Sequence, residues 1–361
     1  MGNMPFSPIK IGSLELKNRF LMSAAVDGMA ADPIARAQRY AELAAGGVGL
    51  IVAGRVLNKE VEFGRVADAV HERGGRIALQ ILSHMGLGFE PKVDSPAASV
   101  VPEGIDIFSN VFPYGRHHEA SDGEIEDSIA SLARAAKLAK SFGVDAIQVH
   151  SAHNSALFQF LTPLTNQRKD KWGGSIENRV RLHREVYKAV RSEIGSDIPL
   201  FIKLGVEDPF PNGLKLEEGI AAAKLLAECG YDAIEVSQGL QDFRDPKTMA
   251  GTPIRMGTVK MSQEGYFRAW CRDVKKAIDK PTIMTGGMRS FELVEEVLAG
   301  GETDMIGMCR PFVKEPGLVK RWEEGNRKKA TCISCNKCGL GLMKGLPLAC
   351  YVKEKWDLPL L

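Results

Sequence analysis

Short apolar runs alternate with longer amphipathic segments along most of this chain. Compact apolar runs are typical of buried strands, whereas apolar residues spaced three or four apart and followed by Gly are typical of helices. The pattern predicts strands at 19–25, 48–53, 76–82, 144–150, 200–204, 232–236, 282–285 and 304–308. It predicts helices at 33–45, 62–73, 124–142, 175–194, 215–229, 263–278, 290–299 and 316–324. The stretch 83–121 shows neither pattern, and an irregular segment of this length usually has a functional role.

Repeated strand–helix units predict a parallel sheet that is covered on both faces. Eight such units indicate an α/β fold, a closed (β/α)₈ TIM barrel. An open, doubly wound sheet uses the same units, but the Gly-x-Gly-x-x-Gly turn typical of that fold does not follow the first strand. We therefore expect a barrel over residues 1–325 and a short cysteine-containing extension over 326–361.

Composition and charge narrow the class of protein. The chain has 361 residues, of which 44% are hydrophobic and 25% charged, an ordinary globular balance. Its 47 Lys and Arg against 45 Asp and Glu leave a formal net charge of +2, so no global field favours nucleic acid or a membrane surface. Residues 1–20 lack the apolar core of a signal peptide, no apolar run is long enough to span a bilayer, and seven cysteines are an odd number for a disulfide scaffold. We expect a cytoplasmic protein.

Two histidines follow the fourth predicted strand, where a barrel places its active site. His150 and His153 are three residues apart across a strand-to-loop turn. Two imidazoles at this spacing can both donate hydrogen bonds to one carbonyl oxygen and polarise it. The alternative is one buried structural histidine and one solvated histidine. A metal site has less support, because no third ligand follows at a suitable spacing.

Two polar residues interrupt otherwise apolar strands. Gln80 lies in the third strand and Lys203 in the fifth. A buried amide and ammonium are costly unless they meet a partner, and both could bind the pyrimidine edge of a cofactor, where Lys203 would stabilise developing negative charge. One alternative is an ion pair inside the barrel between Lys203 and Glu235. Another is a cofactor-free lyase that uses Lys203 as a Schiff base.

The ends of the seventh and eighth strands carry an anion-binding pattern. Gly286 and Gly287 let backbone N–H groups approach an anion, and Arg310 adds a charged fork. Barrels often bind a phosphate at this position. Together with the polar residues on the third and fifth strands, this pattern predicts an elongated phosphorylated cofactor across the mouth of the barrel.

Several segments resemble the Old Yellow Enzyme family of FMN-dependent ene-reductases. They are KNRFLMSAA (17–25), AELAAGGVGLIVAGR (41–55), VHSAHNSALFQFLTPLTNQRKDKWGGSIENR (149–179), TGGM (285–288) and DMIGMCRP (304–311). The resemblance extends over about residues 5–350, and the fourth-strand segment with its GGS-x-ENR ending is highly specific.

The resemblance implies FMN as cofactor, NAD(P)H as reductant and a small unsaturated carbonyl compound as substrate. Hydride would pass through the flavin to an activated C=C bond of an enone, enoate or enoyl substrate, whose carbonyl the catalytic pair His150 and His153 would hold. It also implies a homo-oligomer. The cofactor-binding positions that it implies are Ser23, Ala24, Ala25, Val26, Ala53, Gln80, His150, Lys203, Gly286, Gly287, Cys309 and Arg310.

This chain departs from the family pattern near the flavin and the substrate. Ala24 and Ala25 replace the usual Pro-Met, and Val26 replaces a frequent Cys or Thr that bonds the flavin. The usual proton-donor Tyr is replaced by Ser155 or Gly28. Alternative donors in the long third loop are Tyr114, His117 and His118.

Four cysteines near the C-terminus carry a second resemblance. Cys332-x₂-Cys335-x₂-Cys338-x₁₁-Cys350 is similar to the iron–sulfur segment of the multidomain branch, the 2,4-dienoyl-CoA reductases and trimethylamine dehydrogenases, but is one residue shorter. Such a set could bind a [4Fe-4S] cluster or zinc, or pack against the barrel without metal. The alternative function that follows is an iron–sulfur flavoprotein subunit that takes electrons from a protein partner.

Overall fold

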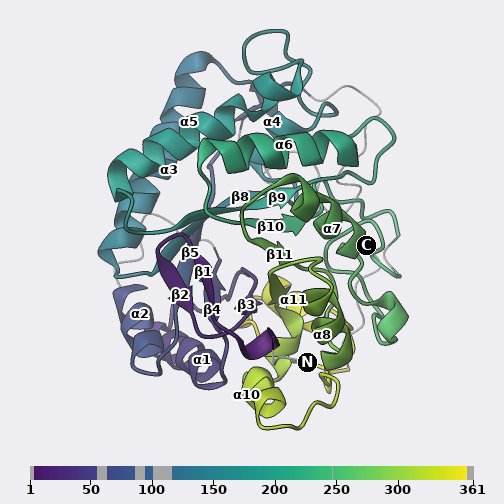
Figure 1. The fold of residues 1–361 in the computed structure, drawn as a ribbon. Helices are drawn as coiled ribbons and strands as arrows, with labels where there is room; N and C mark the ends of the chain where they lie inside the picture. The colour runs from purple at the N-terminus through teal and green to yellow at the C-terminus, as the bar shows by residue number, and fades with distance from the viewer. Residues whose placement is uncertain (1–3, 55–62, 86–93, 101–115, 246, 356–361) are drawn as a thin grey trace.

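A closed barrel of eight parallel strands forms the centre of the molecule (Figure 1). The computed structural model describes residues 4–54, 63–85, 94–100, 116–245 and 247–355. The strands follow one another around the barrel in chain order, and β12 pairs with β3 to close it, so the predicted (β/α)₈ barrel is confirmed. They are β3 (Phe20–Met22), β4 (Leu50–Ala53), β5 (Ile77–Ile81), β8 (Ala146–Ser151), β9 (Leu200–Gly205), β10 (Ile234–Ser237), β11 (Thr282–Met284) and β12 (Met305–Met308).

Helices surround the barrel and bury their apolar faces against the outer side of the strands (Figure 1). They are α1 (Pro33–Ala45), α2 (Phe63–His71), α3 (Asp122–Ser141), α5 (Ile176–Ile194), α6 (Leu216–Cys229), α7 (Arg268–Ala277), α8 (Phe291–Ala299) and α10 (Leu318–Glu323). Capping residues in the sequence set the ends of several helices. Ser121 and Glu124 form a capping box at the start of α3, and Gly230 ends α6 in a left-handed conformation. The predicted helix 263–278 starts later, at Arg268, because Gly265 has φ +60°.

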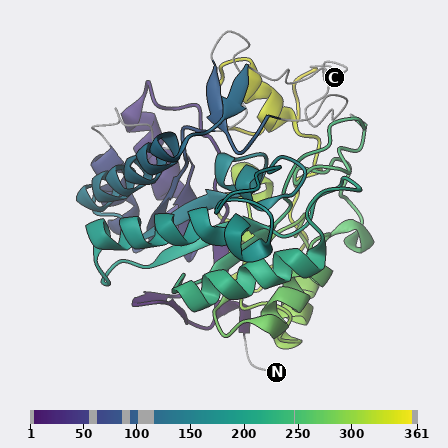
Figure 2. The ribbon, with the colours of Figure 1, turned by 90° about the horizontal axis from the view of Figure 1, so that it is seen from above.

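The interior of the barrel changes from apolar to polar along the strands. Near their amino ends, Leu21, Leu50, Phe201 and other inward side chains form a small core that is separate from the large core under the helices. A hairpin that the sequence analysis did not predict, β1 (Ile9–Ile11) with β2 (Leu14–Leu16), closes this end (Figure 2). Inward positions nearer the carboxyl ends are polar instead, and these positions form the candidate site.

The remaining elements lie in loops and in the C-terminal extension. Within the irregular stretch 83–121, β6 (Ser95–Ala97) and β7 (His117–Glu119) pair in parallel. Short helices occur at Met4–Phe6 (η1), Ala156–Leu161 (α4), Met261–Gln263 (η3), Arg310–Lys314 (α9) and Lys337–Met343 (α11). In the view of Figure 2, α11 and the β6–β7 pair lie at the end of the molecule away from β1–β2. None of the helices in the described ranges is both long and apolar enough to cross a membrane.

Candidate active site at the carboxyl end of the barrel

Two adjoining cavities open at the carboxyl ends of the strands. The larger, of about 350 Å³, lies over β3, β11 and β12, and the smaller, of about 210 Å³, lies over β5 and β8. Both are lined by Ala24, Ala25, His153 and Lys203, so they meet to form one elongated site. An elongated site of this kind has room for the phosphorylated cofactor that the sequence predicts across the barrel mouth.

The structure brings nearly all of the predicted site residues to these two cavities. Ser23, Gly286, Gly287, Cys309 and Arg310 line the larger cavity, and Val26, Gln80 and His150 line the smaller one. Ala53 is placed differently. It is buried in the core under the helices, because Val52 is the inward residue at the end of β4, and Gly54 lines the smaller cavity instead.

The two histidines converge at the end of β8. Their ring centroids are 5.4 Å apart and the rings are inclined by 68°. His153 has a φ of +53°, a conformation that is uncommon for a residue with a side chain and that often marks a functional position. Its Nε2 lies 2.7 Å from the Ser237 hydroxyl, which fixes the orientation of the ring. Ser237 was not among the predicted site residues.

Both imidazoles are held in their uncharged form. Burial, assisted by the nearby ammonium of Lys203, lowers the pKa of His150 to about 3 and the pKa of His153 well below its ordinary value. A neutral imidazole carries one N–H, so each ring can donate a single hydrogen bond into the smaller cavity. Nδ1 of His150 is buried and has no hydrogen-bond partner among the described residues.

The floor of the site contains a hydrogen-bonded chain of polar side chains. Lys203 Nζ lies 2.8 Å from one carboxylate oxygen of Glu235, so the ion pair considered from the sequence is present. Gln148 donates its amide to the other oxygen at 2.6 Å, and Gln80 donates to the Gln148 carbonyl at 2.7 Å. Lys203 and Gln80 also line the cavities, so the pairing with Glu235 does not exclude a role in cofactor binding.

The larger cavity ends in a glycine-rich wall. Gly286 and Gly287 have φ values of +112° and +80°, and a Cβ on Gly287 would lie 2.7 Å from Cε1 of Tyr266. A Cβ on Gly307 would lie 2.7 Å from the Ser23 hydroxyl. Arg310 bonds the Arg255 carbonyl at 2.9 Å, and burial raises the pKa of the Cys309 thiol to about 12, so this thiol is uncharged.

These residues fit FMN. The buried Ser23 hydroxyl, like Nδ1 of His150, has no partner in the described part of the chain, so both can take one from a ligand. Side chains on Gly287 or Gly307 would fill the cavity at the end where Arg310 supplies a cation. Polar groups at the floor and a cationic, glycine-lined end match a polar ring system that carries a phosphate.

The specific fourth-strand motif forms a support for the site. Asn166 donates to the Phe160 and Trp172 carbonyls and so ties the loop after α4 together. The buried Arg168 donates to the Ala98 and Ala120 carbonyls, which connects this loop to the β6–β7 region. The motif therefore ties together two segments beside the barrel mouth, and the contacts that it makes are structural.

The alternative proton donors are placed as follows. Tyr114 lies outside the described residues. His118 bonds Glu124 at 2.9 Å and Asp94 at 3.2 Å on the surface of the loop region. Neither His117 nor His118 is among the described residues that line the two cavities.

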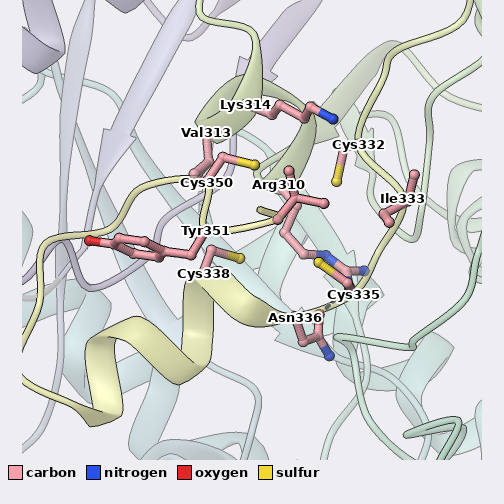
Figure 3. A pocket seen from close by; sticks show the side chains of 11 residues that line it. Arg310, Val313, Lys314, Cys332, Ile333, Cys335, Asn336, Cys338, Cys350 and Tyr351 are labelled. Atoms are coloured by element: carbon pink, nitrogen blue, oxygen red, sulfur yellow. Dashed lines mark hydrogen bonds between the residues drawn. The ribbon is translucent and has the colours of Figure 1, made fainter. Parts of the chain in front are cut away.

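The four C-terminal cysteines line one pocket. In Figure 3 the Cys332, Cys335, Cys338 and Cys350 side chains surround Arg310, which also lines the larger cavity. All seven cysteines of the chain are free. No three His, Cys, Asp or Glu side chains in the described ranges are arranged to share one metal ion. The thiols thus converge on one pocket, but not on one point as tetrahedral zinc requires.

Comparisons with known proteins extend over most of the chain. The NADH:flavin oxidoreductase / NADH oxidase family matches residues 57–329. An NADH oxidase from Thermoanaerobacter brockii is 30% identical over 373 residues, which cover 96% of this chain and 55% of that protein.

Solved structures superpose on the same region. A 2-naphthoyl-CoA reductase bound to 2-naphthoyl-CoA gives a TM-score of 0.79 at 26% identity and covers 96% of this chain and 56% of its own. An old yellow enzyme homologue from Zymomonas mobilis gives a TM-score of 0.71 at 25% identity and covers 91% of this chain and 95% of its own. The chain thus spans about half the length of the NADH oxidase and of the naphthoyl-CoA reductase.

Proposed function

Because the chain belongs to the NADH:flavin oxidoreductase / NADH oxidase family, we propose that it is an FMN-dependent enzyme that reduces an activated C=C bond with electrons from NAD(P)H. The single observation that carries the proposal is the convergence of two neutral histidines, a polar floor and a cationic glycine-lined end on one elongated site. Similarity to an NADH oxidase and to a 2-naphthoyl-CoA reductase supports this reaction class. Bound FMN would supply the hydride relay between the nicotinamide and the substrate.

His150 and His153 hold the substrate in this proposal. Each neutral ring donates one N–H to the carbonyl oxygen of an enone, enoate or enoyl compound, which draws electron density from the C=C bond. Ser237 keeps the ring of His153 in place through its 2.7 Å contact. Neutral donors suit this role, because they polarise the carbonyl without attracting unrelated anions.

The remaining predicted residues would hold the cofactor. Gln80 and Lys203 lie at the floor, where the pyrimidine ring would bind, and the ion pair of Lys203 with Glu235 favours this binding role over Schiff-base chemistry. Gly286, Gly287 and Arg310 would receive the phosphate at the other end of the site. Ser23 to Val26 line the cavities between these two ends.

Spectroscopy tests the cofactor and the reaction together. The purified protein should bind FMN, its flavin absorbance should bleach on addition of NAD(P)H, and a simple enone should restore it. Failure to take up FMN would contradict the proposal, and so would a reduced enzyme that no unsaturated carbonyl compound reoxidises.

Substitution of the histidine pair tests the substrate site. His150→Ala and His153→Ala should weaken the binding of a phenol or an enone at least tenfold while FMN stays bound, because two donors to one oxygen are lost. His183→Ala is the matched control. It removes a buried imidazole that bonds Ser151 on the outer side of β8, so it should lower stability and leave ligand affinity unchanged.

The pocket lined by Cys332, Cys335, Cys338 and Cys350 suggests a second cofactor. We propose a [4Fe-4S] cluster there, because a multi-iron cluster bonds each thiolate through a separate iron and so suits four thiols around one pocket. Such a centre would also suit the second candidate function, an iron–sulfur flavoprotein subunit with a protein electron donor. Iron and sulfide analysis after anaerobic purification tests both, and protein that contains neither would contradict them.

The organisation of the whole protein is also a proposal. We keep the division into an FMN-binding barrel, 1–325, and a cysteine-containing extension, 326–361. The seven free cysteines favour a reducing compartment such as the cytoplasm. The homo-oligomer that the family resemblance implies is tested by light scattering, and a monomer at micromolar concentration would contradict it.

A further inference from the structure

Glu235 is a fully buried carboxylate beneath the floor of the site. It lies on β10, is 0% exposed, and uses both oxygens: one accepts from Lys203 Nζ at 2.8 Å and the other from Gln148 Nε2 at 2.6 Å. Strand register accounts for the contacts, because Glu235 is paired with Lys203 and Gln148 with Gln80 on neighbouring strands. Four polar residues from four strands therefore form one connected chain.

The charge of Glu235 determines the direction of every hydrogen bond in this chain. An ionised carboxylate only accepts hydrogen bonds, so the Gln148 amide must present its N–H₂ group to Glu235. The Gln148 carbonyl is then left to accept, and Gln80 must donate to it, as it does at 2.7 Å. The Gln80 amide is thereby held in one of its two orientations, with its carbonyl oxygen free for a ligand.

Only the two ends of the chain reach the cavities. Lys203 and Gln80 line them, whereas Glu235 and Gln148 are absent from the described residues that form their walls. Glu235 therefore cannot touch a ligand in the site. Glu235 can act on a ligand only at a distance, through the electrostatic field that it forms together with Lys203 and through the orientation of Gln80.

We propose that Glu235 is a positioning residue that sets the reduction potential of the cofactor, an inference that rests on the proposed binding of FMN. The ammonium of Lys203 stabilises negative charge, which reduction adds to the bound ring system. The adjacent carboxylate offsets part of that positive charge. Glu235 thus keeps the potential lower, and the bound cofactor a stronger reductant, than an unpaired lysine would.

Glu235→Gln in the FMN-loaded protein tests this directly. The substitution preserves shape but removes the negative charge and the fixed direction of the chain. We expect reduced FMN to gain affinity over oxidised FMN by at least about tenfold, which is a rise in potential of about 30 mV for a two-electron couple. An unchanged or lower potential would overturn the inference.

A double-mutant cycle shows whether Glu235 acts through Lys203. Lys203→Met should lower the potential, and in that background Glu235→Gln should lose more than half of its effect. An effect of the same size with and without Lys203 would overturn the proposed route.

If Glu235→Gln does not fold, Glu235→Asp replaces it, because the shorter side chain withdraws the carboxylate from Lys203. It should raise the potential by a smaller amount, and no rise would count against the inference.

Ser151→Ala is the matched control for burial and strand. Ser151 lies on β8, as Gln148 does, and forms a buried 2.7 Å contact with His183, but outside the barrel. Its loss should reduce stability and leave the potential unchanged.

Wild-type protein that binds no FMN would refute the proposed function. FMN-loaded protein in which Glu235→Gln leaves the potential unchanged would refute only the inference about Glu235.

Discussion

Two buried imidazoles, His150 and His183, and the half-buried imidazole of His153 have environments that oppose a positive charge. Burial lowers the pKa of His150 to about 3 and of His183 to about 4, and it holds the pKa of His153 well below its ordinary value. His183 is a buried residue of α5 that bonds Ser151 on β8, so its neutral state is a matter of core packing. The same physical cause therefore acts on the two proposed binding residues and on one structural residue, so a lowered pKa alone does not distinguish the two roles.

These histidines should make the protein sensitive to acid. Their pKa values are lower in the folded chain than the value of about 6.5 that unfolding restores, so the unfolded state binds more protons below that pH. Stability should be fully present above about pH 6.5 and should fall as the pH decreases towards the folded pKa values. Each imidazole would contribute about 2 kcal/mol of loss at about pH 5.

Urea unfolding of FMN-free protein at about pH 7 and about pH 5 measures this loss. The variant His150→Gln/His153→Gln should lose less stability over the same interval than the wild type, whatever its stability at pH 7. Equal losses in the two proteins would show that these imidazoles are not the origin of the acid sensitivity.

Gly287 is the glycine whose replacement should affect FMN binding most directly. An alanine would be strained at φ +80° and would place its Cβ against Tyr266, whose hydroxyl is bonded to the Pro253 carbonyl and holds the ring in place. Gly287→Ala should lower FMN affinity at least about tenfold, or about 1.4 kcal/mol, as measured by flavin fluorescence. Gly301→Ala is the control, since φ is +66° but no atom lies within 4 Å of the new Cβ. Equal FMN affinity in both variants would contradict a role for Gly287 at the cofactor.

Hydrophobic periodicity predicted the strands and helices of the barrel well, but it missed the β1–β2 hairpin and the tail helix α11. The helix at 33–45 matches α1 to the residue, because Pro33 and the glycine pair at 46–47 mark both ends. The β1–β2 hairpin was missed although Ile-Lys-Ile and Leu-Glu-Leu alternate around Gly12, since strands of three residues give a weak signal. The tail helix α11 contains two glycines and was missed because it forms against the barrel.

Local sequence patterns also predicted only part of the candidate site. His150, Gln80, Lys203 and Gly287 were predictable because each follows or interrupts a strand. The partner of His153, Ser237, comes from β10, and the orientation of Gln80 depends on Glu235 through Gln148. Such contacts arise from barrel closure and register, which a local pattern does not contain.

The β1–β2 hairpin should stabilise the barrel without influencing its chemistry. Ile11 is fully buried in the small core at the amino ends of the strands, opposite the cavities. Ile11→Ala should lower the free energy of unfolding by about 2–5 kcal/mol through the cavity that it leaves. The absorbance spectrum and affinity of bound FMN should not change. Lys10→Ala, at the exposed middle position of the same strand, should have little effect, and comparable destabilisation by both substitutions would contradict this role.

At the scale of the whole molecule, the extension is joined to the site through two arginines. Arg289 is fully buried and bonds the Gly287 carbonyl, the Cys332 carbonyl and the Ser334 hydroxyl. Arg310 lines both the cysteine pocket and the larger cavity. The extension therefore supports two residues in the wall of the larger cavity at its glycine-lined end, so changes in the extension should reach a cofactor bound there.

Asn336 provides a direct test of that connection. Its side-chain oxygen accepts from Arg310, and its amide nitrogen donates to the Ile254 carbonyl at 2.6 Å, so it holds the guanidinium at the phosphate end. Asn336→Ala should weaken FMN binding about tenfold, or about 1.4 kcal/mol. Riboflavin, which has the same ring system but no phosphate, should bind the variant and the wild type equally. Titration of both flavins separates a loss of the phosphate contact from general damage to the barrel. An equal loss of affinity for both flavins would show that the extension acts on the whole site and not through Arg310.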